Sequence, residues 1–128
     1  MKTILLLSLF FNLAFCEIVV MISTKNKLVK VTKKELTDIY LKKKSKIRGI
    51  TVIPIDNRKD YASFCKNVMN KTPKQMRAYW ARELYRGTKK PPKVKNNKQI
   101  KKAIKENSKI ISYASNKLTG KIILKISN

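Results

Sequence analysis

Short runs of consecutive apolar residues, many of them β-branched, recur along this sequence and predict β-strands. The first run covers residues 18–22 and is apolar at every position, which predicts a strand buried on both faces and central in its sheet. The second run, residues 50–55, contains Pro54. Proline cannot donate a ladder hydrogen bond, so this part is expected at a sheet edge or at the strand's exit. Residues 109–113 and 121–126 predict two further strands, the first of them interior.

Between these strands, apolar residues recur at helical spacing and predict amphipathic helices. The first helix, residues 33–42, begins beside Thr32 and Glu35, which have the spacing of a capping box. A second helix follows from Tyr61, because apolar side chains recur there at i, i+3, i+4, i+7 and i+8. Helices and strands therefore alternate through the first half of the chain.

Two more helices are predicted in the second half. Thr72 and Pro73 form a cap followed by proline at the first helical position, and Gly87 ends this third helix. A proline- and lysine-rich connection precedes a short fourth helix that ends near Asn107. The alternation of elements predicts an α/β fold, with a mixed and mostly parallel sheet flanked by helices on both faces.

The N-terminus has the pattern of a secretory signal peptide. A lysine precedes an apolar run at residues 4–11, which is too short to span a bilayer. Cleavage after Cys16 would divide the chain into a signal peptide, residues 1–16, and one domain, residues 17–128. A lipoprotein anchored at Cys16 is the alternative, although Phe15 is larger than the residue that normally precedes a lipidated cysteine.

Composition narrows the function more than it narrows the fold. The chain has 31 lysines and arginines against seven acidic residues, a net charge of +24, and no histidine. Triads or dyads that use histidine and histidine-ligated zinc are therefore excluded. The carboxylate pairs are explained as charges at helix starts, so we predict a non-enzymatic protein without a metal or cofactor. Cys65, the one thiol after residue 16, is interpreted as a small buried hydrophobe.

Four segments together resemble the phosphate-binding component of bacterial ABC transporters. They are KELTDIYLKK at 34–43, ITVIPIDN at 50–57, AYWARELYRGTKKPP at 78–92 and IISYA at 110–114. In that family the first segment resembles ELxDIFLGK, the third YWxRxxFxGxxxPP and the last PGAIGYV. The resemblance implies the type II periplasmic-binding-protein fold, with about one lobe's worth of chain.

The same resemblance points to one loop as the ligand site. Larger phosphate receptors hold the oxyanion at helix N-termini with a Ser-Gly-Thr motif beside an arginine and an aspartate. This chain has Asp56, Asn57, Arg58, Lys59 and Asp60 at that place. Asp56 matches the aspartate loosely, whereas the serine, glycine and threonine are missing.

The turn before the second helix also has the chemistry of an oxyanion site. We expect Asp56 and Asn57 to shape the turn and cap the helix, leaving free backbone N–H groups beside Arg58 and Lys59. The alternative is an ordinary capped helix whose charges are solvated.

The third helix offers an interaction face. Arg82 and Arg86 are one helical turn apart and Arg77 precedes them, so the helix can present guanidinium groups beside Tyr79 and Tyr85. The alternative is an amphipathic helix whose aromatic residues, Trp80 in particular, belong to the core.

Two functions follow from these observations. The first is a periplasmic, non-enzymatic solute-binding-like protein that binds a small oxyanion such as phosphate and assists a membrane transporter. The second is an exported basic protein that binds polyanions or envelope surfaces and uses the lobe only as a scaffold. Dispersed lysines favour weak, salt-sensitive attraction to nucleic acid or anionic lipid.

Overall fold

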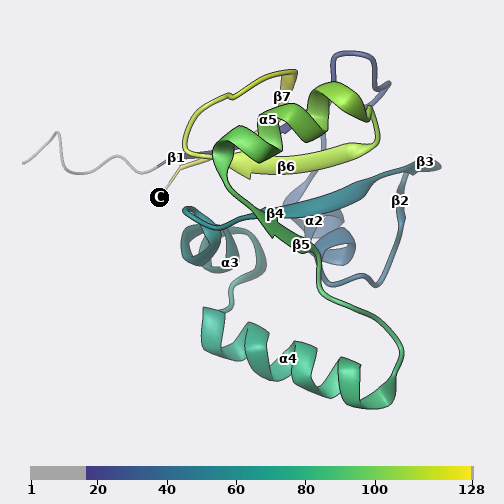
Figure 1. The fold of residues 1–128 in the computed structure, drawn as a ribbon, viewed down its shortest axis with the longest axis vertical. Coiled ribbons are helices and arrows are strands. Elements are labelled where there is room, and N and C mark those ends of the chain that lie inside the picture. The colour runs from purple at the N-terminus through teal and green to yellow at the C-terminus, as the bar shows by residue number, and fades with distance from the viewer. Residues whose placement is uncertain (1–16, 128) are drawn as a thin grey trace, which may run out of the picture.

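The computed structural model describes residues 17–127, so the predicted signal peptide and its cleavage site lie outside the described residues. Figure 1 shows one sheet with helices on both of its faces. The strands of this sheet are β1 (Glu17–Ile22), β4 (Ile53–Asn57), β5 (Lys93–Lys95), β6 (Ile110–Ala114) and β7 (Lys121–Ser127). The helices are α2 (Lys33–Tyr40), α3 (Tyr61–Met69), α4 (Pro73–Arg86) and α5 (Asn97–Glu106). No helix within this described range is long and apolar enough to cross a membrane.

The sheet has the strand order β5-β4-β6-β1-β7. Strands β5, β4 and β6 run parallel, whereas β1 runs antiparallel to both β6 and β7. The predicted mixed α/β sheet is therefore confirmed, and β1 and β6 are interior strands as expected. Two of the four pairings are parallel and two are antiparallel, so the sheet is mixed and not mostly parallel. The sequence could not show this, because an apolar run predicts a buried strand but does not indicate the direction of the strand.

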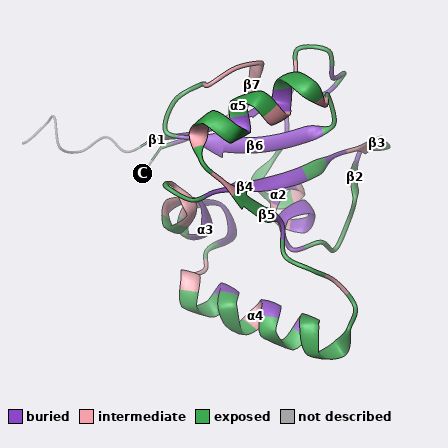
Figure 2. Cartoon of the chain, in the orientation of Figure 1, coloured by how far each residue is buried: buried purple, intermediate pink, exposed green. Residues whose placement is uncertain are grey.

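Strand β1 supplies side chains to a core on each side of the sheet. Ile18, Val20 and Ile22 belong to the larger core, which α2 and α3 cover. Val19 and Met21 point the other way, into a smaller core under α5. The alternation of side chains along a strand explains why both faces of β1 are apolar. Figure 2 shows that burial is concentrated in the sheet and on the inner sides of the helices.

The predicted second strand is divided in the structure. A short hairpin, β2 (Lys46–Ile47) and β3 (Ile50–Thr51), precedes β4, and the sequence analysis missed this hairpin. Pro54 lies near the start of β4, where only β6 pairs with the strand, because β5 joins from Ile55 onward. The proline therefore stands at a local edge, as expected, and not at the strand's exit.

Three capping boxes begin helices in this fold. Thr32 and Thr72 accept backbone hydrogen bonds from Glu35 and Gln75, which confirms both predicted caps. A third box, at Asn96, begins α5. The expectation that Asp56 and Asn57 cap α3 is wrong, because the helix begins only at Tyr61 and Asp60 occupies its N-cap position without a capping hydrogen bond from its side chain.

An aromatic cluster fills the larger core between the sheet and α3. The rings of Phe64 and Tyr113 stack with their centroids 3.8 Å apart, and Tyr40 packs against Phe64 at 4.7 Å. Cys65 is buried beside them, which confirms its interpretation as a core residue. Burial raises the pKa of its thiol to about 11, so it is not a reactive thiolate at neutral pH.

Candidate anion-binding site

The path of the chain marks one end of the sheet as the place for a ligand. From β4 the chain passes through α3 and α4 to β5 on one side of β4, and then through α5 to β6 on the other side. Connections that leave in opposite directions form a crevice at the carboxyl ends of the strands, where open α/β sheets bind ligands. Of the predicted site residues, Asp56 and Asn57 are the last two residues of β4, and Arg58 and Lys59 follow it at this end.

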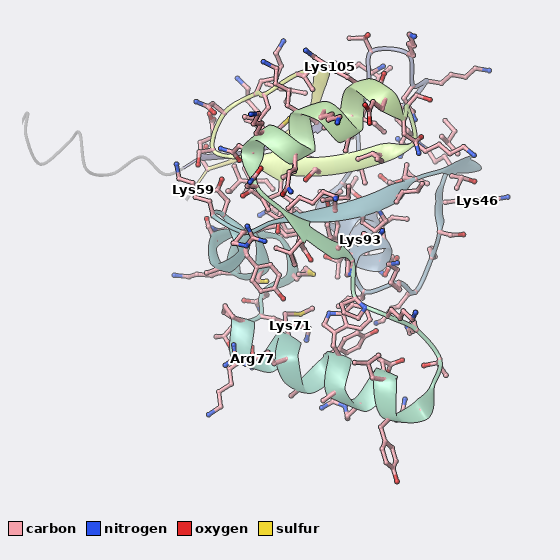
Figure 3. The ribbon with its side chains drawn as sticks, in the orientation of Figure 1. Lys46, Lys59, Lys71, Arg77, Lys93 and Lys105 are labelled. Atoms are coloured by element: carbon pink, nitrogen blue, oxygen red, sulfur yellow. The ribbon has the colours of Figure 1, made fainter. Side chains whose placement is uncertain are left out.

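A shallow pocket of about 430 Å³ opens here, and it is lined by Arg58, Lys59, Asn96, Asn97 and Lys98. The loop after β4 and the first turn of α5 therefore meet at one surface. Lys59 is labelled on this side of the molecule in Figure 3. Arg58, Lys59 and Lys98 are exposed and form no salt bridge within residues 17–127. The pocket wall thus contributes three cationic side chains and no carboxylate.

Asn57 holds the two sides of the pocket together. Its side chain is fully buried, and its Nδ2 donates to Oδ1 of Asn97 at 2.7 Å and to the carbonyl of Tyr113 at 2.9 Å. Its Oδ1 accepts a hydrogen bond from the backbone N–H of Lys59 at 2.9 Å. One amide therefore fixes the end of β4 against both α5 and β6.

Asp56 lies in the protein interior and is not part of the pocket wall. Its carboxylate accepts a hydrogen bond from the hydroxyl of Tyr113 at 2.7 Å and forms no salt bridge with any described residue. Burial, which disfavours the charged form, raises the pKa of Asp56 to about 7, although the bond from Tyr113 partly opposes this. The structure thus separates Asp56 from Arg58 and Lys59, which point to the surface.

The expectation of free backbone N–H groups in this turn is wrong for Arg58 and Lys59, because both N–H groups donate hydrogen bonds to other groups of the protein. The N–H of Arg58 donates to the carbonyl of Lys95 at 3.0 Å, since the pairing of β4 with β5 continues past the strand end. The N–H of Lys59 is taken by Asn57. The carboxylate of Asp60 accepts hydrogen bonds from the backbone N–H and the hydroxyl of Ser115, the residue that follows β6. An anion would have to be held by side chains and by the start of α5.

Asn96, Asn97 and Lys98 were missed as site residues. The sequence holds a signal for the helix start, because Asn96 and Gln99 have capping-box spacing. It holds no signal for the approach of this helix to Arg58, since that depends on strand order.

The predicted interaction face lies elsewhere, on α4. Arg77, Arg82, Tyr85 and Arg86 are all exposed, and Arg77 is labelled in Figure 3. Trp80 is buried in the larger core, so the core interpretation is confirmed for this aromatic residue. The arginines and Tyr85 occupy the outer side of the same helix. The expectation that Tyr79 lies beside them is wrong, because Tyr79 packs against the larger core and its hydroxyl donates to Leu41.

The fold is similar to one lobe of solved phosphate transport receptors. The chain superposes on an ABC-type phosphate transport receptor from Vibrio cholerae with a TM-score of 0.64 and 16% identity, covering 87% of this chain and 46% of the receptor. A protein described as a phosphate ABC transporter substrate-binding protein, solved with bound phosphate from Clostridium perfringens, gives a TM-score of 0.58 at 14% identity, with coverages of 78% and 40%. PstS from Borrelia burgdorferi gives 0.56 at 14%, with coverages of 79% and 42%.

These similarities confirm the predicted fold and its extent. The chain spans less than half the length of each of the three solved proteins, which corresponds to one lobe. No protein-family model matches the sequence. A search of curated protein sequences gives no match either.

Proposed function

We propose that this chain is an exported, non-enzymatic protein that binds a small oxyanion and assists a transport system. The observation that supports this most directly is the pocket at the carboxyl ends of β4 and β5. Three cations, Arg58, Lys59 and Lys98, line it without a carboxylate among the lining residues. Export rests on the signal-peptide pattern of residues 1–16, and the transport role rests on the resemblance to transport receptors.

The start of α5 adds donors to these charges. The first N–H groups of an α-helix have no partner within the helix, and Asn97 and Lys98 are its first two residues. The positive end of the helix dipole also favours an anion at this position. A guanidinium can bind two oxygens of phosphate or sulfate at once, so Arg58 is assigned the main charge-assisted contact. Bound phosphate in the Clostridium perfringens protein supports the choice of ligand class.

Calorimetric titration with phosphate and sulfate tests this proposal. Arg58→Ala should weaken binding by about one to two decades, because charge-assisted hydrogen bonds contribute about 1.5–3 kcal/mol each. The far-UV spectrum should not change, since the side chain is exposed. Arg77→Ala is the matched control, because it removes the same exposed side chain from α4. Equal losses in the two variants, or no binding by the unmodified protein, would contradict the proposal.

Polyanion binding is the second candidate, and α5 supplies the observation that favours it. Ile100 and Ile104 turn inward to the smaller core. The exposed side of the helix carries four lysines at i, i+3, i+4 and i+7, namely Lys98, Lys101, Lys102 and Lys105. Figure 3 labels the last of these on α5. Such a row is about 10 Å long and can follow a chain of phosphates or sulfates.

Salt dependence separates the two candidates. Removing two lysines by Lys101→Ala with Lys102→Ala should reduce the slope of log affinity against log salt by about 1 to 2 for a heparin oligosaccharide. The same variant should leave phosphate binding unchanged, because neither lysine lines the pocket. An unchanged slope would exclude α5 as the polyanion surface.

A further inference from the structure

Helix α4 is attached to the rest of the protein along one side only. Met76 and Trp80 are buried in the larger core, and the hydroxyl of Tyr79 donates to the carbonyl of Leu41 at 2.9 Å. The helix stands apart at one end of the molecule in Figure 1. Its opposite side is exposed along its whole length in Figure 2. A helix of this length therefore presents a continuous surface that the described chain does not cover.

This surface combines arginine, tyrosine and small residues. We define the outer face of α4 by six of its exposed residues, namely Arg77, Ala78, Ala81, Arg82, Tyr85 and Arg86; Lys74, Gln75 and Leu84 are exposed on the same helix. Tyr85 is 94% exposed, which is unusual for so large an aromatic side chain. A shallow pocket of about 390 Å³ lies between Ala81, Arg82, Tyr85 and Arg86. Tyrosine and arginine are the residue types that dominate protein interfaces.

The outer face carries no negative charge. Glu83 is the one acidic residue of the helix, and it is buried on the inner side. Its carboxylate accepts a hydrogen bond from the hydroxyl of Thr88 at 3.0 Å, and Lys89 lies 3.8 Å away. Arg86 donates a hydrogen bond to this carboxylate at 3.4 Å through one guanidinium nitrogen, and its side chain remains 65% exposed. Arg77 and Arg82 form no salt bridge within the described residues, so they are available to an external anion, and the exposed side of the Arg86 guanidinium can join them.

The choice of arginine sets α4 apart from the rest of the chain. The sequence has five arginines against 26 lysines, and three of the five, Arg77, Arg82 and Arg86, lie on this one helix. A general need for positive charge would be met by lysine, as it is at most exposed positions. Arginine differs because its planar fork binds a carboxylate through two parallel hydrogen bonds and stacks on aromatic rings.

We propose that the outer face of α4 docks an acidic segment of a partner protein. Arg82 and Arg86 bind carboxylates of that segment. Tyr85 lies between the two arginines and packs on the apolar parts of the segment's side chains. A lipid headgroup surface is the weaker match, because the lysines on the other faces of the chain would attract anionic headgroups as well and would not single out α4. This surface is separate from the anion pocket, so the proposal does not depend on phosphate binding.

The test uses a labelled oligoglutamate peptide as the probe and fluorescence anisotropy at physiological salt. Arg82→Lys combined with Arg86→Lys keeps the net charge, and we expect about tenfold weaker binding because the paired hydrogen bonds are lost. Tyr85→Ala should also weaken binding several-fold. Arg48→Lys is the matched control, because it makes the same change at an exposed arginine outside α4 and outside the anion pocket, and it should leave peptide affinity unaltered.

Three results would overturn the proposal. The first is unchanged affinity in the double lysine variant, which would mean that charge alone attracts the peptide. The second is an equal loss in Arg48→Lys, which would mean that the effect of arginine is not specific to α4. The third is binding to phosphatidylglycerol vesicles that is tighter than peptide binding and depends on Arg82 and Arg86, which would assign the face to a membrane. Because all these side chains are exposed, circular dichroism should confirm that each variant is folded.

Discussion

The carboxylate of Asp60 accepts two hydrogen bonds from Ser115, one from its backbone N–H at 3.0 Å and one from its hydroxyl at 2.9 Å. This pair joins the loop before α3 to the residue that follows β6, at the switch point of the sheet. A negative charge therefore lies next to Lys59, which lines the candidate anion pocket. Its field opposes an anion in the neighbouring pocket.

Asp60→Asn should therefore raise the affinity for phosphate. The amide is similar in size and still accepts a hydrogen bond, whereas the repulsion from a nearby carboxylate is removed, for an expected gain of about threefold to tenfold. Calorimetric titration measures the change. Glu106→Gln, which neutralises an exposed carboxylate at the far end of α5, is the control and should have a smaller effect. Unchanged or weaker binding in Asp60→Asn would show that the pocket does not sense this charge.

The buried carboxylate of Asp56 should make stability depend on pH. Its pKa is raised to about 7, above the value in an unfolded chain, so the folded protein holds the proton more tightly. Stability is therefore highest below the unfolded pKa and falls as pH rises toward 7, by up to about 4 kcal/mol. Above that pH both states are ionised and the loss is constant.

Asp56→Asn should remove this dependence. The amide oxygen can still accept the hydrogen bond from Tyr113, and no charge is buried at any pH. The difference in unfolding free energy between the variant and the unmodified protein should then grow in favour of the variant from about pH 4 to pH 7. Urea denaturation at a series of pH values measures it, and a difference that stays constant over this range would contradict the assignment.

Local rules predicted much of the fold because local residues decide it. Thr32 and Thr72 form their caps with residues three positions away. The apolar run of β1 predicts a buried strand without any knowledge of its neighbours, and the strand is buried from Ile18 to Ile22. The direction of β1 and the turn that follows β4 depend on distant partners. Asp56 was assigned to a helix cap because it precedes an amphipathic pattern, yet Tyr113, far along the chain, determines its hydrogen bond.

The sequence predicted only those residues of the candidate site that lie next to a predicted strand. Arg58 and Lys59 follow a predicted strand, so the sequence could place them at a strand end. Their neighbour Lys98 comes from α5, and only the strand order brings that helix to them. The sequence also could not show that the N–H of Arg58 would extend the pairing with β5.

Gly120 should be the least replaceable glycine of the described chain. Its φ is +70°, and a Cβ there would lie 2.2 Å from the carbonyl oxygen of Ile22. Gly120→Ala should therefore cost several kcal/mol, because the backbone of β1 or β7 must move. Gly87→Ala is the control, since its φ is +68° but no atom lies within 4 Å of the added carbon, and about 1 kcal/mol is expected. Equal losses of stability would contradict the close contact.

Helix α4 should detach without unfolding of the sheet. Met76→Ala removes an anchoring side chain and should weaken docking of the helix by about 2–5 kcal/mol. Trp80 is the single tryptophan of the sequence, so its fluorescence should shift to longer wavelength as it becomes exposed. Leu84→Ala on the same helix is the control, because Leu84 is already 54% exposed. Global loss of amide protection in Met76→Ala would show that α4 unfolds together with the core.

The position of β1 also determines when this protein can fold. Val19 pairs with Ala114 on one side and with Lys125 on the other, so the strand nearest the start of the sheet-forming chain meets its partners only among the last to be made. β1 is synthesised early, so its backbone stays unpaired and its apolar side chains stay uncovered until the rest of the sheet has been made. Completion of β6 and β7 is therefore the event that closes the sheet. A chain cut short before them leaves its most apolar strand open to aggregation with other chains.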